Sequence, residues 1–552
     1  MDPGTGVPTR NWPRPAFRRP SSRGGGLGRL VATLLTVPVA LPLLYLVVLA
    51  LRAGPARLWT GLVRAEAAPL LARVGLLAAG ATLWALALGA PWAWLVARTD
   101  VPGRRFFRWL GPLPLAIPPY VGALAYIFLL APRQLLHRAL AAWSGGSVYD
   151  IPFPDLIYGP WGAAFVLGTF TAPYVFLNVH GALGRLDPAL EDAARGLGHG
   201  PRAVFRRVTL PLLRPALTAG ALLVFGYAWV DFGVVSLLRV RTFTTVVYTY
   251  LLAGLDLAAA AGLSLVLVLI VWATLGLQGR ALGRARYTQR NGRESARAIV
   301  PLGRWRPLAF LYLGLVAGLT LILPLGVLVY QAAGIGSLGT LGAFLLNQAP
   351  HLWNSLRVAA AGSGLCLLLA APVAWQAWRG QGGAVAGALL QAGYAIPGTV
   401  LGLSLIGLAL ALVPALYERP IPLLATAYAV LFAAPALQGV RAALAQVPPS
   451  MEEAVRALGR GPLVAAARVV APLAWPGIAS TWLLGFILAL RELAATIVLR
   501  PAGFDTLPVR IWTYSTEVGL DPRAAVLALL LVALVGLPWL LLTVRRQGAM
   551  GL

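Results

Sequence analysis

Two carboxylates occupy equivalent places in two long apolar stretches of this 552-residue chain. Asp231 and Glu492 lie 261 positions apart, and Arg491 directly precedes the second. A charged group at the centre of a membrane-spanning helix costs about 2.5–3.5 kcal/mol, so it normally faces a cavity or a partner. One hypothesis is that all three residues line a central path. The alternative is that Glu492 pairs with Arg491 or Arg500, and Asp231 with Arg239 or a backbone group.

Other residues capable of chemistry are sparse. His137, His180, His199 and His351 share no metal-ligand spacing, so no metal site is assigned. The single cysteine, Cys366, lies in an apolar run and cannot form an internal disulfide. A hard trivalent cation prefers oxygen ligands to thiolate or thioether, and a chain with one Cys and three Met is compatible with such a substrate. No clustered His/Asp or Ser/His arrangement indicates an enzyme.

The chain contains no lysine, so all 45 basic residues are arginine. A nucleotide-binding P-loop requires the lysine of GxxxxGK[ST]. The chain therefore cannot supply an ATP site of that type, and no cofactor is predicted.

The composition is that of a protein embedded in a lipid bilayer. Hydrophobic residues make up 59% of the chain and charged residues 11%, with a mean hydropathy of +0.77. A soluble protein of this size would carry about 25% charged residues. The net charge of +27 comes from arginines clustered between apolar runs, which is the positive-inside bias of a multi-spanning protein and excludes nucleic acid as the partner.

Successive apolar runs of about 20 residues predict an all-α polytopic membrane protein with about twelve transmembrane helices in two parallel six-helix repeats. The predicted spans are residues 30–51, 70–97, 109–131, 160–184, 214–238, 257–279, 308–332, 355–378, 385–413, 421–444, 476–499 and 523–544. The predicted domains are a basic cytoplasmic tail, a first transmembrane domain, a basic cytoplasmic linker and a second transmembrane domain, covering residues 1–29, 30–279, 280–306 and 307–552. The arginine distribution predicts that both termini are cytoplasmic.

Prolines recur at matching places in the two halves. Pro91 in the second span corresponds to Pro372 in the eighth, and Ala116-Ile117-Pro118 corresponds to Ala395-Ile396-Pro397. Proline within a spanning helix frees a backbone carbonyl and kinks the helix. The kinks indicate either a gated pathway or ordinary packing. The external loop 132–159 has no counterpart of similar length in the second half.

A polar segment also occurs twice, as residues 186–217 and residues 447–478, and the two copies align without gaps. Each copy follows the fourth span of its half. In the first copy, Asp187 is a candidate N-cap for a short helix. In the second, Ser450 and Glu453 fit a capping box. Each copy therefore predicts a short helix, a glycine turn and a second short helix on the cytoplasmic surface.

The paired segments resemble the EAA loop of ABC-transporter permeases, in which an E-x-A-x-x-x-x-G pattern is followed at a fixed spacing by proline. The matching residues are Glu191, Asp192, Ala193, Ala194, Gly198 and Pro211 in the first copy and Glu452, Glu453, Ala454, Gly459 and Pro472 in the second. The resemblance implies that these loops dock into grooves on two ATPase subunits. Because Ala194 becomes Val455 and Gly196 becomes Ala457, the second docking surface is expected to be bulkier.

The resemblance extends over most of the chain. The chain is similar to permeases whose two domains are fused, as in ferric-iron and thiamine importers. The segments from Arg491 to Leu507 and from Asp231 to Thr245 resemble the REL-x-AT…LRP-x-GFDTL and DFG…TFTT patterns of ferric-iron permeases. The expected function is that of a non-enzymatic permease subunit in the bacterial cytoplasmic (inner) membrane, served by an external substrate-binding protein. Thiamine, an oxyanion or a phosphonate remain alternative substrates, and a secondary transporter driven by an ion gradient is the rival class.

Overall fold

The structure is a computed structural model that describes residues 26–252, 256–285, 299–380, 382–394, 396–516 and 521–548. Within these ranges it is helical, and its single β-bridge joins Thr99 to Val300. Most of the predicted N-terminal tail, residues 286–298 of the predicted linker and Ala395 lie outside the described residues.

The helices of the first half are α1 (Gly26–Ala53), α2 (Pro55–Arg64), α3 (Ala67–Arg98), α4 (Arg104–Leu110), α5 (Pro119–Leu130), α6 (Leu135–Ser144), α7 (Pro160–Arg185), α8 (Pro188–Gly196), α9 (Pro201–Val204), α10 (Leu210–Val230), α11 (Gly233–Leu237), α12 (Phe243–Leu252) and α13 (Leu257–Ala285). Those of the second half are α14 (Arg306–Ala317), α15 (Leu323–Ala333), α16 (Leu338–Trp378), α17 (Ala384–Tyr394), α18 (Gly398–Leu412), α19 (Pro414–Tyr417), α20 (Pro420–Leu444), α21 (Pro449–Ala457), α22 (Pro462–Ala465), α23 (Ala471–Leu490), α24 (Ala494–Leu499), α25 (Leu507–Thr516) and α26 (Pro522–Gly548).

The membrane-spanning architecture predicted from hydropathy is confirmed. Among the described residues, ten helical segments are long and apolar enough to cross a bilayer, and the bent pair α17–α18 makes an eleventh. The apolar part of α26, Pro522–Pro538, is shorter. Together these elements are consistent with about twelve spans. Proline at the first turn begins many of the helices, including α7, α8, α20, α21 and α26, where its missing N–H would be unpaired in any case.

Four of the predicted spans are interrupted, and the expectation of simple proline kinks in spans three and nine is wrong. In span three, α4 is followed by a 3₁₀ turn, Leu113–Ala116, and α5 starts anew after Pro118. In span nine, α17 and α18 meet at 108° across the segment that contains Pro397. Proline favours such breaks because it prevents the preceding residue from adopting helical geometry.

Spans five and eleven also end before their predicted limits. The fifth stops at Val230 and the eleventh at Leu490, and each is followed by a short separate helix, α11 or α24. The breaks thus fall at Asp231 and at Arg491-Glu492, the residues singled out by their charge. A helix end inside the membrane must have its free backbone groups paired. Polar residues at the breaks can supply this pairing.

Pro91 lies inside α3, and a side chain from the other half pairs with a carbonyl group that it leaves free. Proline at this position leaves the carbonyl four residues earlier, that of Ala87, without its helical N–H. The Tyr312 hydroxyl, on α14, donates to Ala87 O at 2.7 Å and to Leu88 O at 2.9 Å. A contact between the two halves therefore pairs the backbone carbonyl that Pro91 leaves free.

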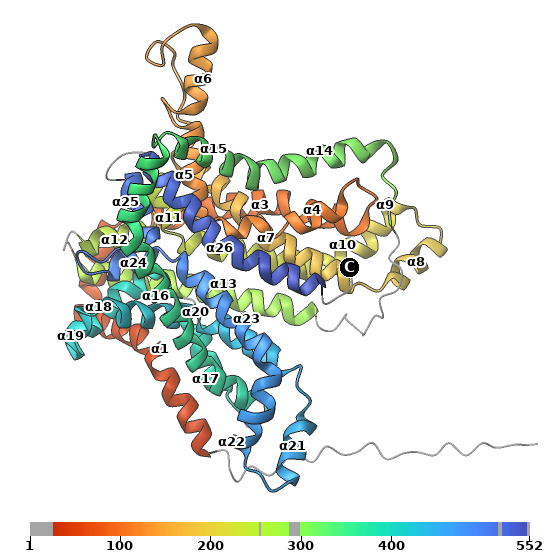
Figure 1. Ribbon diagram of the computed structural model, residues 1–552, viewed down its shortest axis with the longest axis vertical. Coiled ribbons are helices and arrows are strands. Elements are labelled where there is room, and N and C mark those ends of the chain that lie inside the picture. Colours follow the sequence, from red (N-terminus) through yellow and green to blue (C-terminus); the bar gives the residue numbers. More distant parts are fainter. Residues whose placement is uncertain are drawn as a thin grey trace, which may run out of the picture.

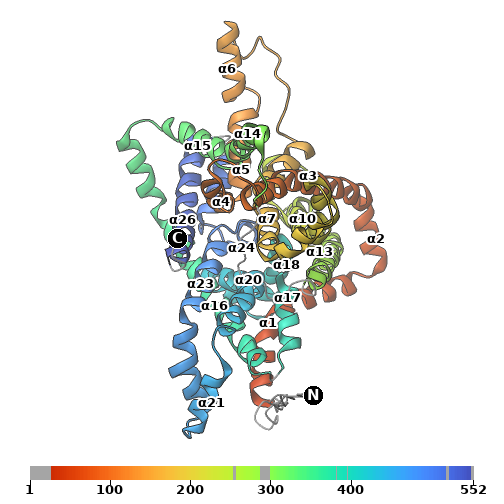
Figure 2. The same cartoon turned by 90° about the vertical axis from the view of Figure 1, so that its right-hand side faces the viewer.

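The first span of each half packs against the opposite half. Figures 1 and 2 show α1 beside α17 and α18 of the second half. The contact is close, because a Cβ placed on Gly393 would lie 2.5 Å from Val39 Cγ1, and one on Gly407 would lie 2.1 Å from the Tyr45 hydroxyl. Conversely, α14 packs on α3 and α4, and α15 packs on α5. Each predicted transmembrane domain therefore contributes its first span to the packing of the other domain.

The long loop 132–159 contains its own helix. Figures 1 and 2 show α6 projecting from the body as a continuation of α5, while α21 lies at the opposite end of the molecule. His137 ties the loop together, since its Nδ1 accepts the Arg133 N–H at 2.9 Å and its ring stacks on Phe153 at 4.7 Å. This histidine has a packing role.

Because the first span of each half packs on the other half, we expect the two halves to associate without a covalent link. A chain divided between residues 285 and 299 should yield two fragments that co-purify in detergent, because each fragment's first span is packed on the other fragment. Affinity purification through a tag on one fragment measures this directly. Recovery of the tagged fragment alone, with both fragments present in the membrane, would contradict the packing described above.

Candidate functional site

The two duplicated loops fold into the same structure. In each, a short helix, α8 or α21, ends at a glycine with positive φ, Gly198 at 83° or Gly459 at 76°. Equivalent backbone bonds close both turns: His199 N donates to Ala194 O at 3.2 Å, and Arg460 N donates to Val455 O at 3.3 Å. This six-to-one bond with a left-handed glycine is the Schellman motif, which explains the glycine in each copy.

The segment after the turn is duplicated as well. One turn of π-helix, Phe205–Thr209 or Ala466–Val470, joins the second short helix to α10 or α23. These two turns are separated along the chain by the same offset as Asp231 and Glu492. Pro211 and Pro472 occupy the second residue of α10 and α23, directly after the π-helical turn. Each short surface helix is thus connected directly to a membrane-spanning helix.

The start of each short helix can be compared with the sequence prediction. Asp187 is the N-cap of α8, as predicted, and its Oδ1 accepts the Ala189 N–H at 3.0 Å. The capping box predicted from Ser450 and Glu453 is wrong, because α21 begins at Pro449 with Pro448 as N-cap and without a side-chain cap. Pro449, the first residue of α21, starts the helix in place of a capping box.

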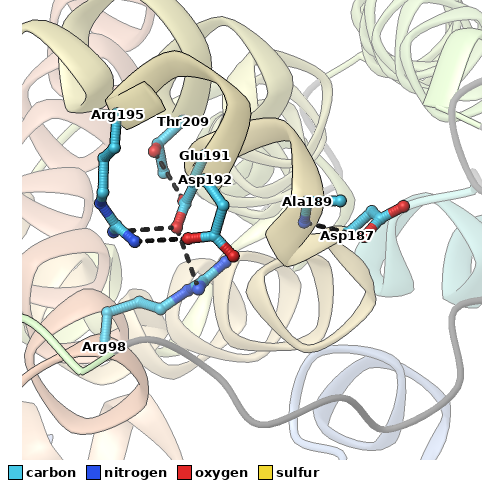
Figure 3. Close-up of polar contacts among 7 residues, drawn as sticks. All are labelled: Arg98, Asp187, Ala189, Glu191, Asp192, Arg195 and Thr209. Atoms are coloured by element: carbon cyan, nitrogen blue, oxygen red, sulfur yellow. Dashed lines mark hydrogen bonds and ion pairs between the residues drawn. The ribbon is translucent and has the colours of Figure 1, made fainter. Parts of the chain in front are cut away.

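Glu191 lies inside the protein rather than on its surface. Its side chain accepts hydrogen bonds from Arg98 Nη1 at 3.3 Å and Thr209 Oγ1 at 2.8 Å, and Arg195 lies 3.8 Å away (Figure 3). Arg98 is the last residue of α3, and only 3% of its side chain is exposed. Buried ionic groups require such pairing, so Glu191 fixes α8 to the end of a spanning helix.

The second loop repeats this anchor with fewer contacts. Glu452 forms an ion pair with Arg379 at 3.1 Å, and Arg379 directly follows α16. Val470 occupies the position of Thr209, so the hydroxyl bond of the first loop has no equivalent. The side chain of Arg379 is 16% exposed, against 3% for Arg98. The second loop is therefore held less tightly.

The anchoring arginines were missed by the sequence prediction. Arg98 and Arg379 each stand at the same distance after the matched prolines Pro91 and Pro372. Their common spacing was the available signal. It was hidden because the longer external loop lies between these arginines and the duplicated polar segments, so the repeat offset before that loop differs from the offset after it.

With the glutamates turned inward, apolar side chains face outward from both short helices. The exposed pairs are Leu190 and Leu197 in the first loop and Met451 and Leu458 in the second, with exposures of 49%, 79%, 45% and 80%. Asp192, Ala193, Glu453 and Ala454 are exposed on the same loops. Each loop thus offers a small apolar surface bordered by charge.

The expectation of a bulkier second surface holds for one of its two exchanges. Ala194 is buried against the body of the protein, and its counterpart Val455 is half-buried. Their size difference therefore lies mainly on the inner side of the helix, and only the exposed exchange of Gly196 for Ala457 changes the outer surface. The asymmetry of the loops resides chiefly in how they are anchored.

The end of the interdomain linker binds beside the first anchor. Val300 N donates to Arg98 O at 2.8 Å, while Asp100 accepts bonds from Leu302 N at 2.9 Å and from the Arg306 guanidinium. The Arg306 bond, and then the Leu302 amide, lower the pKa of Asp100 below its ordinary 3.8. A lowered carboxyl pKa means that this contact is lost only as pH falls below that range, so it persists at neutral pH.

The predicted path residues meet in a central cavity of about 250 Å³. Asp231, Arg491 and Glu492 line it, together with Tyr120 and Tyr174. Both halves contribute to its wall, through the starts of α5, α11, α18 and α24 and through parts of the long spans. The breaks in spans three, five, nine and eleven therefore converge on one space.

Each cavity carboxylate caps a short helix. Asp231 Oδ2 accepts the N–H groups of Val234 at 2.9 Å and Val235 at 3.2 Å, and Glu492 Oε1 accepts that of Ala495 at 2.9 Å. Asp231 was expected to pair with either Arg239 or a backbone group, and the pairing with backbone groups is confirmed. Neither Arg491 nor Arg500 forms an ion pair with Glu492 among the described residues, so that alternative is wrong.

Arg491 instead connects the halves. Its Nη1 donates to Leu115 O at 3.0 Å and its Nη2 to the Tyr174 hydroxyl at 3.4 Å, both in the first half. Arg500 pairs with Asp505. The position equivalent to Arg491 is Val230, so this contact exists on one side of the pseudo-symmetric cavity.

An all-helical membrane protein with two repeated halves, a central cavity and paired surface loops is a transport permease in architecture. Residues 86–281 match the family described as the binding-protein-dependent transport system inner membrane component. The chain belongs to this family, because a molybdenum transport system permease protein of Mycobacterium bovis is 32% identical over 238 residues, covering 85% of that protein and 42% of this chain.

Similarity over greater length occurs with another member. An Fe(3+)-transport system permease protein of Haemophilus influenzae is 28% identical over 523 residues, which is 93% of this chain and 97% of that protein. A sulfate transport system permease protein of Synechocystis is 33% identical over 144 residues, which is 26% of this chain and 49% of that protein. The chain is thus the membrane permease of a binding-protein-dependent ABC importer.

The different anchors predict unequal effects of the same substitution in the two loops. Glu191→Gln removes the charge facing a deeply buried guanidinium, whereas Arg379 can reach water when Glu452→Gln is made. Breaking a buried ion pair costs about 3–5 kcal/mol, and a partly exposed one costs less. Glu191→Gln should therefore lower the thermal unfolding temperature more than Glu452→Gln does.

The control for this comparison is Asp192→Asn, since the Asp192–Arg195 pair at 2.8 Å is exposed and such pairs contribute about 0–1 kcal/mol. Thermal unfolding of the three purified variants measures the effect. Equal losses for Glu191→Gln and Glu452→Gln would show that the anchors are equivalent.

Proposed function

We propose that this chain is the permease subunit of a ferric-iron importer. Two observations support the substrate: the long relative named for Fe(3+) transport, and the cavity that contains Asp231 and Glu492 with Arg491 as its single basic lining residue among those described. Two carboxylates attract a cation and repel an anion. The acidity of the cavity is the observation on which the substrate class rests.

An oxyanion is the second candidate, because relatives of the chain are named for molybdenum and sulfate transport. Arg491 is the feature that favours it. However, both Nη groups of Arg491 are engaged by the first half, and the carboxylates oppose a dianion. Thiamine is itself a cation, so the carboxylates suit it as well, and the relative named for Fe(3+) transport is what favours iron over it. The carboxylates oppose a phosphonate, and no observation favours an ion-gradient-driven secondary transporter.

In the proposed mechanism the chain performs no ATP chemistry itself. Two ATPase subunits dock on the cytoplasmic face, each receiving one of the apolar surfaces on α8 and α21. The residues proposed for this coupling are Glu191, Asp192, Ala193, Ala194, Gly198, Pro211, Glu452, Glu453, Ala454, Gly459 and Pro472. Glu191 and Glu452 act indirectly, since they fix the helices whose outer faces meet the ATPases.

Closure of the ATPase subunits would move the two loops toward each other. Each loop is joined through its π-helical turn to a spanning helix that ends at a cavity carboxylate: α10 ends before Asp231, and α23 ends before Arg491 and Glu492. Movement at the cytoplasmic surface is thereby transmitted to the cavity wall. An external binding protein would deliver the substrate on the opposite side, where α6 projects (Figure 1).

The proposed setting is the bacterial cytoplasmic membrane, with both termini inside. The start of α1 and the loop helix α21 lie at the same end of the molecule in Figures 1 and 2. The arginines of residues 98–108 and of the linker are on that side in the predicted topology, which agrees with the positive-inside rule.

The substrate proposal predicts that iron uptake depends on the cavity carboxylates. In vesicles that contain the ATPase and binding-protein partners, Asp231→Asn and Glu492→Gln should each reduce ATP-dependent uptake of radioactive iron at least ten-fold, because each removes a negative charge from the path. Asp150→Asn, in the external loop, is the matched control and should transport normally.

Co-purification with the ATPase must be unchanged in these variants, so that an assembly defect is separated from a transport defect. Wild-type uptake by both cavity variants would remove them from the path. Uptake of molybdate or sulfate in place of iron would overturn the substrate, and uptake that persists without any ATPase would overturn the transporter class.

A further inference from the structure

Tyr120 lines the cavity, and its buried hydroxyl has no partner among the described residues. It is the second residue of α5, its Cβ lies against Gly233 at the start of α11, and it is 5% exposed. No described residue forms a hydrogen bond with its Oη. A buried polar atom left unpaired costs about 1–3 kcal/mol, so such a group beside a cavity requires an explanation, and a bound ion supplies one.

The two carboxylates of the cavity also have binding capacity to spare. Their capping bonds use Asp231 Oδ2 and Glu492 Oε1. An ionised carboxylate has two oxygens and about four acceptor sites, so Asp231 Oδ1 and Glu492 Oε2 remain for another ligand. The capping bonds at the same time fix the orientation of both groups.

The donor set is composed of oxygen. The cavity-lining residues include tyrosine, aspartate and glutamate, and none of those described is a histidine, cysteine or methionine. Oxygen donors select hard cations, whereas thiolate and imidazole ligands favour softer metals. The one nearby cation, Arg491, directs both Nη groups to the first half rather than to the carboxylates.

We propose that Tyr120 Oη, Asp231 Oδ1 and Glu492 Oε2 form a transit site for a hard trivalent cation. The site rests on the proposed function, and it specifies how that substrate is recognised within the membrane. Binding through Tyr120 forms one metal–oxygen bond, breaks the phenolic O–H bond and releases the proton to water. The three ligands then carry three negative charges, which match the charge of the cation.

The repeat supplies a matched control position. Thr399 is the counterpart of Tyr120 at the start of α18, it is fully buried, and its Oγ1 likewise has no partner among the described residues. Thr399 does not line the cavity, however. The site is therefore one-sided, with its phenolic ligand supplied by the first half.

Terbium(III) tests the site, because this hard trivalent ion luminesces when a nearby aromatic side chain transfers excitation to it. The complete chain, held in phosphatidylcholine nanodiscs, should show one saturable luminescence component that iron(III) displaces and molybdate does not. Tyr120→Phe should weaken this component at least ten-fold, as should Asp231→Asn and Glu492→Gln. Thr399→Val should leave it unchanged.

Tyr120→Phe removes only the unpaired hydroxyl, so its thermal unfolding temperature should equal or exceed that of the unmodified chain. This result separates loss of a ligand from loss of the fold. Terbium binding by Tyr120→Phe that equals the wild type, or the absence of a saturable component in the wild type, would overturn the site.

The failure of the site is distinguishable from failure of the proposed function. If the wild type imports iron with ATP and Tyr120→Phe imports it equally well, the transit site is wrong and the function stands. If the wild type imports an oxyanion and no iron, the proposed function is wrong whatever terbium does.

Discussion

The pairing of free backbone groups at helix breaks inside the membrane is the constraint on which the rest of this structure depends. Water cannot satisfy an interrupted helix in the hydrocarbon region, so the protein must. Asp231 and Glu492 do this by accepting N–H groups from the first turns of α11 and α24. The helices α5 and α18 also begin within the bundle. The four interruptions together enclose the cavity. The charge needed for structure is thereby placed on the wall of the cavity.

A second pair of glutamates anchors the surface loops to spanning helices. Glu191 and Glu452 bind the arginines that end α3 and α16, while their own helices lead through a π-helical turn into α10 and α23. Each half is therefore a continuous path of packed helix from a surface loop to a cavity carboxylate. The halves are not equivalent, since Thr209 and the linker reinforce the first anchor alone, and Arg491 bridges the cavity from the second half alone.

Much of this arrangement could be predicted from the sequence, because hydropathy and duplication are properties of long segments. The spans, the paired loops and the equivalence of Asp231 and Glu492 all follow from the repeat. The helix breaks do not, since a span with proline is compatible with either a kink or an end, and the choice depends on neighbouring helices. The capping box at Ser450 failed because a proline one residue earlier already started the helix. The residues that were missed are those defined by contacts between distant parts of the chain: Arg98 meets Glu191, and Tyr312 meets the Pro91 kink. Tyr120 was missed because an aromatic residue in an apolar run resembles any packed side chain until its surroundings are known.

A distance measurement tests whether the surface loops and the cavity are rigidly connected. Spin labels replacing Gly196 and Ala457, both on exposed loop positions, report the separation of α8 and α21 in the complex with the partner ATPase. A second pair of labels on the outer ends of α5 and α18 reports the cavity opening. The two separations should change together when a non-hydrolysable ATP analogue is added. A changed separation of the loops with an unchanged separation of α5 and α18 would show that the loops and the cavity are not rigidly connected.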